Sequence, residues 1–153
     1  MTAPNHALAG ALIGLSIANP WLALPLAFLS HFVLDAIPHY DPPGQDSSER
    51  ISSKRFEKEL YGQAIVCFVI VLILVIAQPK QWLAAAFGAF LGASPDLFWV
   101  PRFLYVKWTG RDKDLRNPFL RFHSLIQWKT SPKLWPIEAV WFVVVGTLVL
   151  IKL

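Results

Sequence analysis

Apolar residues gather in five long runs along the chain, separated by short polar breaks or by longer charged connections. The runs cover roughly 5–18, 20–37, 61–77, 81–99 and 134–151. Each approaches the roughly 20 apolar residues that an α-helix needs to cross the hydrocarbon layer of a membrane, although the first run is short. The pattern predicts an all-α, polytopic membrane bundle of about five membrane segments, forming one domain over residues 1–153.

The connections between these runs predict how the segments are oriented. Asn19-Pro20 and the stretch 78–81 are tight breaks, which favour antiparallel helical hairpins. The longer connections, 41–60 and 100–133, carry four and eight of the fourteen Lys and Arg residues. By the positive-inside rule both are cytoplasmic, so the N-terminus is cytoplasmic and the C-terminus lies outside.

Composition agrees with a multi-pass membrane protein. The chain is 55% apolar with seven Trp and eleven Phe, and its mean hydropathy is +0.46. Aromatic residues of this kind are enriched at membrane–water interfaces. The first apolar run lacks the basic start of a signal peptide, so we expect a retained helix. Cys67 is the only cysteine, which excludes a disulfide framework within the chain.

Basic and aromatic residues alternate in the connection 100–133. In a soluble protein this pattern would suggest nucleic acid, but between membrane spans it favours the headgroups of anionic lipids. We therefore expect membrane lipids as partners and no nucleic acid. The basic residues of this pattern are Arg102, Lys107, Arg111, Lys113, Arg116 and Arg121.

Four acids and histidines lie inside the apolar runs, where a charge is costly and usually functional. The densest group is in "SHFVLDAIPHYD", residues 30–41, which holds His31, Asp35, His39 and Asp41. The spacing of four residues stacks side chains on one helical face. Pro38 disfavours helix at the preceding residue, which would turn His39 and Asp41 back toward Asp35. Such a set predicts a divalent metal site, with Zn or Mn favoured.

Further candidates come from other segments on the same predicted side of the membrane. Asp96 follows Pro95 in "GASPDLFW" and must face the bundle interior or a wet cavity, as a ligand or as a helix cap. His6 stands at a helix start, which favours its neutral, metal-binding form. His123 in "RFHSLIQW" is a ligand, a general acid, or part of an interfacial amphipathic segment in which it faces lipid headgroups. Glu138, one turn inside the last run, is a candidate proton carrier.

Several short motifs together resemble a known family. They are "PNHALAGALIG", "SHFVLDAIPHYD", "GASPDLFW" and "RFHS". In them the chain is similar to the LexA-binding, inner-membrane-associated family of membrane-bound metal-dependent hydrolases. The resemblance implies functional positions at His6, Asp96 and His123. The chain differs from the family pattern in having Leu97, where a second Asp is usual.

We therefore expect metal-dependent hydrolysis of a lipid-linked ester, a phosphoester first, with Glu138 or His123 moving protons. A bound metal would lower the pKa of a coordinated water toward ~7. Six or more candidate ligands would be enough to hold a second metal ion.

Two alternative functions stay open. One is a scaffold in which the metal only staples the bundle. The other is a divalent-cation transporter. It would need polar residues across the whole membrane, and the run "AIVCFVIVLILVIA" has no charged or hydrogen-bonding side chain that could serve.

Overall fold

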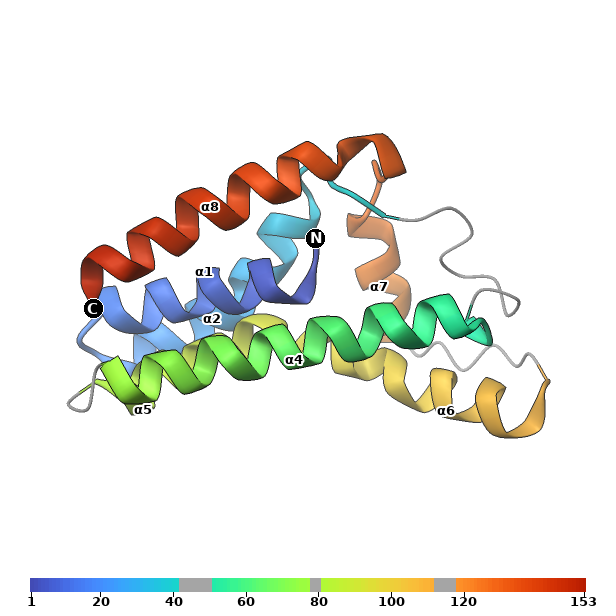
Figure 1. Ribbon diagram of the computed structural model, residues 1–153, viewed down its shortest axis with the longest axis horizontal. Helices are drawn as coiled ribbons and strands as arrows, with labels where there is room; N and C mark the ends of the chain where they lie inside the picture. Colours follow the sequence, from blue (N-terminus) through green and yellow to red (C-terminus); the bar gives the residue numbers. More distant parts are fainter. Residues whose placement is uncertain (42–50, 78–80, 112–117) are drawn as a thin grey trace.

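The computed structural model describes residues 1–41, 51–77, 81–111 and 118–153. These residues form helices joined by short connections, and the only ladder pairing among them is one isolated bridge between His39 and Thr130. The all-α fold class is thus confirmed (Figure 1). The elements are α1 (Ala3–Ser16), α2 (Pro20–Asp35), α4 (Lys54–Ala77), α5 (Trp82–Ala93), the 3-10 helix η1 (Ser94–Trp99), α6 (Val100–Thr109), α7 (Pro118–Ile126), the 3-10 helix η2 (Pro132–Leu134) and α8 (Trp135–Lys152).

Three of the described helical stretches are long and apolar enough to cross a membrane, fewer than the five expected. They are Lys54–Ala77, Trp82–Thr109 and Pro132–Lys152. Helices α1 and α2 have 14 and 16 residues. At 1.5 Å per residue they reach only about 21 and 24 Å, short of a hydrocarbon layer about 30 Å thick. The expectation of two further spans at 5–18 and 20–37 was wrong in length, because α1 ends at Ser16 before the Asn19-Pro20 break and α2 ends at Asp35, three residues before Pro38.

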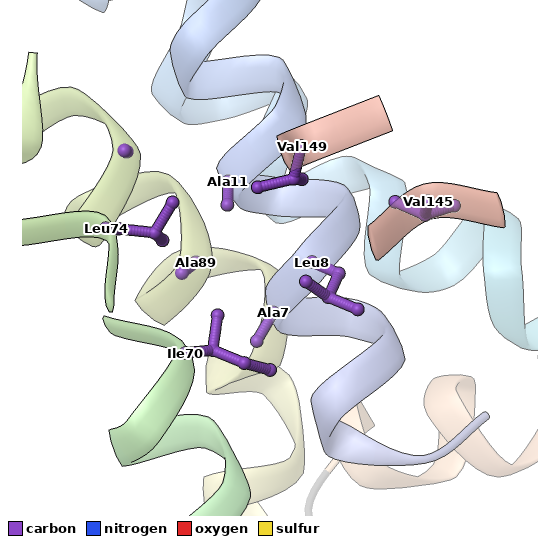
Figure 2. Packing of buried hydrophobic residues seen from close by; sticks show 9 residues of the cluster. Ala7, Leu8, Ala11, Ile70, Leu74, Ala89, Val145 and Val149 are labelled. Atoms are coloured by element: carbon purple, nitrogen blue, oxygen red, sulfur yellow. The ribbon is translucent and has the colours of Figure 1, made fainter. Parts of the chain in front are cut away.

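Helix α1 is the centre of the bundle, packed by α2, α4, α5 and α8. Figure 2 shows Ala7, Leu8 and Ala11 of α1 facing side chains of α4, α5 and α8. The partners are Ile70, Leu74, Ala89, Val145 and Val149. Many large apolar side chains on the outer faces of α4 and α8 are exposed. This is the reverse of a water-soluble bundle and fits helices whose outer faces meet lipid.

Glycines allow α1 and α5 to touch backbone to backbone. A Cβ placed on Gly10 would lie 2.0 Å from the carbonyl oxygen of Gly88, and one on Gly92 would lie 2.4 Å from that of His6. Both contacts are shorter than any side chain tolerates, so only glycine fits there. The spacings Gly10-x3-Gly14 and Gly88-x3-Gly92 are the small-residue pattern that lets membrane helices approach closely. This contact brings the first turn of α1 beside the end of α5.

The helix ends that carry polar residues meet at one level of the bundle. In Figure 1 the C-terminus and the start of α5 lie at the left, while the N-terminus lies near the middle with α7 beyond it. The start of α1 and the ends of α2 and α5 therefore come together close to α7. The polar groups of the sequence are collected there.

Candidate metal centre

Four side chains from three separate elements converge on one point. His31 and Asp35 come from α2, Asp96 from η1 and His123 from α7, and one ligand atom from each lies within 4.8 Å of the others. The side chains of His31, Asp35 and His123 are completely buried. Nitrogen and carboxylate oxygen donors gathered this closely form a group that can hold a divalent metal ion.

Helix α2 supplies two donors from one face. Asn19 caps its start by accepting from the Trp21 amide at 3.0 Å. The helix ends at Asp35, where Pro38 follows three residues later. His31 and Asp35, four residues apart, therefore both face inward in the last turn, and His31 Nε2 lies 3.2 Å from Asp35 Oδ2.

Aromatic packing holds α7 against α2. The Phe32 ring meets the rings of Phe119 and Phe122 at centroid distances of 5.8 and 5.7 Å. Beyond the helix, Trp128 Nε1 donates to the Ala36 carbonyl oxygen at 2.9 Å. These contacts fix α7 so that His123 Nε2 lies 2.7 Å from Asp35 Oδ2.

Asp96 is the member of the group that faces open space. The 3-10 helix η1 begins at Ser94 directly after α5, with Pro95 and Asp96 in its first turn. Asp96 Oδ1 lies 3.6 Å from His31 Nε2, and the Asp96 side chain is 34% exposed. Water or a substrate could therefore approach the group from the side of Asp96.

The hydrogen bond of His31 to the α5 backbone decides which of its two ring nitrogens carries the proton. His31 Nδ1 lies 2.9 Å from the carbonyl oxygen of Gly92, which can only accept, so Nδ1 carries the proton. In a neutral imidazole Nε2 then presents a lone pair. That lone pair faces oxygens of Asp35 and Asp96 and lies 2.9 Å from His123 Nε2. The lone pair and the carboxylate oxygens repel one another, so a proton or a metal cation is needed between them.

The second oxygen of Asp35 has its own neighbours. His6 Nε2 lies 3.0 Å from Oδ1 and His39 Nε2 lies 3.9 Å from it. The amino group of Met1 also contacts Oδ1. His6 comes from the first turn of α1, so the close α1–α5 packing places it here.

His39 is held from outside α2. Its amide donates to the Lys129 carbonyl and its own carbonyl accepts from the Ser131 amide, at 3.3 and 3.1 Å. Its Nδ1 lies 2.8 Å from the carbonyl oxygen of Ile37. Burial lowers the pKa of His39 below the ordinary histidine value, which favours the neutral form that can bind a metal.

Glu138 lies beside the start of α1. Its Oε2 accepts from the Thr2 amide and hydroxyl at 3.0 and 2.9 Å, and from Asn5 Nδ2 at 2.6 Å. The carboxylate thus satisfies free donors at the start of α1, one turn before His6. The structure places it outside the group of four, and its predicted part in proton transfer stays a prediction.

The expected ligands and the observed group overlap but differ. The structure brings His31, Asp35 and Asp96 together, as the sequence predicts, with His6 and His39 on the other side of Asp35. His123, expected foremost as a proton carrier, stands among the possible ligands. Asp41 is buried near His39 and lines the adjacent cavity. Sequence reasoning missed Gln127, whose Nε2 donates to Asp35 Oδ2 at 2.8 Å.

A cavity of about 560 Å³ adjoins the group. Its polar lining includes His39, Asp41, Asp96 and Gln127, together with Glu59 and Gln63 of α4. From there it continues between α4 and α5, along apolar side chains. These include Ala64, Cys67, Phe68, Val71, Phe90 and Ala93.

Comparisons of the chain with protein-family models, with curated proteins and with solved structures find no match. The arrangement of side chains therefore carries the functional argument.

Proposed function

We propose that this chain is a metal-dependent hydrolase of the inner (plasma) membrane that cleaves a lipid-linked ester, a phosphoester first. The resemblance in its motifs to the LexA-binding family of membrane-bound metal-dependent hydrolases points the same way. The observation that carries the proposal is the continuity between two features: a buried His/Asp group that could hold a metal ion, and an apolar cavity that reaches it between helices α4 and α5.

The donor set fits a divalent ion. His31, His123, Asp35 and Asp96 offer two imidazole nitrogens and two carboxylate oxygens, a set that suits Zn and also Mn. A metal bound there would polarise the substrate oxygen and lower the pKa of a coordinated water to about 7. Gln127 orients Asp35 by donating to Oδ2, and Gly92 fixes the tautomer of His31.

The cavity suits an amphipathic substrate. Its apolar stretch would take a hydrocarbon chain, while the polar end would place the scissile ester beside Asp96, the group's most exposed member. A buried chain is favourable by about 0.8 kcal/mol per CH₂. For an anionic headgroup, the exposed residues Arg111 and Arg121 supply positive charge. Lys113 and Arg116 of the same basic stretch lie outside the described residues.

Proton transfer falls to Glu138 or His123 in this proposal. His123 Nε2 lies 2.7 Å from Asp35 Oδ2, and His123 can carry a proton there only if another residue takes its place as a metal ligand. Glu138 is buried and keeps Oε1 without a hydrogen-bond partner among the described residues. A carboxylate so placed is suited to accept a proton when one is released nearby.

A lipid phosphoester assay tests the proposal. Purified protein in detergent is freed of metal, reloaded with Zn or Mn, and incubated with phospholipids in mixed micelles, and headgroup release is followed by mass spectrometry. We expect release that depends on metal and is lost in Asp35→Asn. If metal stabilises the protein but no product is released from any phosphoester or carboxylic ester, the result would support the non-catalytic scaffold with a structural metal instead. Uptake of the metal by proteoliposomes would support the transporter.

A further inference from the structure

The two oxygens of Asp35 are surrounded by separate histidines. Oδ2 faces His31 Nε2 and His123 Nε2 at 3.2 and 2.7 Å. Oδ1 faces His6 Nε2 and His39 Nε2 at 3.0 and 3.9 Å, and it also contacts the Met1 amino group. The group of four accounts only for the Oδ2 side, so the Oδ1 side is a second set of donors.

One histidine of each set is oriented through its outer nitrogen. His39 Nδ1 lies 2.8 Å from the Ile37 carbonyl oxygen, just as His31 Nδ1 lies 2.9 Å from that of Gly92. A carbonyl accepts only, so both Nδ1 atoms carry a proton and both Nε2 atoms present lone pairs to Asp35. Holding a histidine through its outer nitrogen is how proteins orient metal ligands.

His6 adds a second nitrogen to the Oδ1 side. Its side chain is completely buried. Its ring stacks on that of His31 with centroids 3.8 Å apart, so the two parallel rings direct Nε2 to different oxygens of the same carboxylate. Two ligand atoms bonded at about 2.0–2.1 Å to a tetrahedral ion are separated by about 3.3 Å. The distances of 3.0 and 3.9 Å to Oδ1 lie on either side of that separation.

We propose that Asp35 bridges two divalent cations, the second displacing the Met1 ammonium from Asp35 Oδ1 and held by Oδ1, His6 Nε2 and His39 Nε2. This inference rests on the metal centre of the proposed function. Two ions about 3.5–4 Å apart, sharing a carboxylate, are the arrangement that clamps both the attacking and the leaving oxygen of a phosphoester. The second ion therefore narrows the substrate class toward phosphoesters.

Metal stoichiometry tests the second ion. The full chain in detergent is loaded with Mn²⁺, desalted, and measured by elemental analysis and by EPR. We expect two equivalents per chain and a Mn²⁺ signal broadened by the neighbouring ion. His6→Ala and His39→Ala should each lose one equivalent and recover the sharp signal of an isolated ion. Glu57→Gln, which removes a carboxylate far along the chain from these donors, should keep both equivalents.

The outcomes separate the two proposals. One equivalent in the wild type, with hydrolysis retained, overturns the second ion and leaves the proposed function standing. Two equivalents that persist in both histidine variants also overturn it, since the second ion then binds elsewhere. A wild type that binds no metal overturns both. Where a histidine variant fails to fold, a wild type with only one equivalent, or with two equivalents and the sharp signal of isolated ions, still overturns the second ion.

Discussion

His31 Nδ1 lies 2.9 Å from the carbonyl oxygen of Gly92, so the end of α5 fixes the tautomer of a histidine on α2. Gly92 also lies against His6, because a Cβ there would come within 2.4 Å of the His6 carbonyl oxygen. One glycine thus positions a donor on each side of Asp35. Close helix packing and the candidate metal chemistry are therefore linked.

Gly92→Ala should separate α1 from α5. The added methyl cannot avoid the backbone of α1, and overpacking of this kind costs about 1–3 kcal/mol. We expect a lower midpoint of thermal unfolding in detergent and reduced metal content, measured on the same sample. Gly62→Ala is the matched control, because a Cβ at Gly62 meets no atom within 4 Å. If both variants behave like the wild type, this helix contact does not position the site.

Glu138→Gln should separate proton transfer from positioning. The amide can still accept from Thr2 and Asn5 through its oxygen, so the fold and the bound metal should be retained. Loss of the proton acceptor should reduce turnover by ~10²-fold or more, measured as headgroup release. Glu138→Ala should in addition lower thermal stability, because three donors lose their partner. Unchanged turnover in Glu138→Gln would leave Glu138 only as an anchor of α1.

The cavity makes a prediction about chain length. Ala64→Trp should fill the space between α4 and α5 and raise KM for long-chain substrates, while a short-chain soluble ester should be cleaved as before. Ile65→Trp is the matched control, since Ile65 is the next residue, is 63% exposed and does not line the cavity. Equal effects of both variants, or equal effects on long and short chains, would contradict a chain-binding cavity.

The charge distribution predicts the orientation of the helices. In a Cys67→Ser background, Lys58→Cys should resist an impermeant thiol reagent in intact cells, because the basic connections are expected to be cytoplasmic. Gln81→Cys, immediately before the start of α5 and also exposed, should be labelled. The reverse labelling pattern would invert the topology.

The helices could be predicted from apolar runs alone, because the 3.6-residue period and the prolines are local properties. Asp96 and His31 could be expected to meet because both lie in apolar runs near the same predicted membrane surface, where an unpaired charge is costly. The number of spans was overestimated, because every apolar run was counted as a span although α1 has only 14 residues and α2 only 16.

The position of α7 is the part that sequence could not supply. His123 reaches Asp35 because Phe119 and Phe122 pack on Phe32, a tertiary contact between segments far apart in the chain. Two signals were present in the sequence and not used. One was the pair of Gly-x3-Gly spacings in α1 and α5. The other was Gln127, one helical turn after His123, whose amide reaches the same carboxylate.

The metal content of the purified protein tests the central claim most directly. Wild type and Asp35→Asn are produced separately under the same conditions and purified in detergent without chelator. Each is then loaded with Zn or Mn, desalted and measured by elemental analysis. Asp35 is the carboxylate that every histidine of the site faces, so we expect metal retained by the wild type and lost from a folded Asp35→Asn. A wild type without metal after loading, or an Asp35→Asn that retains as much metal as the wild type, would contradict the account.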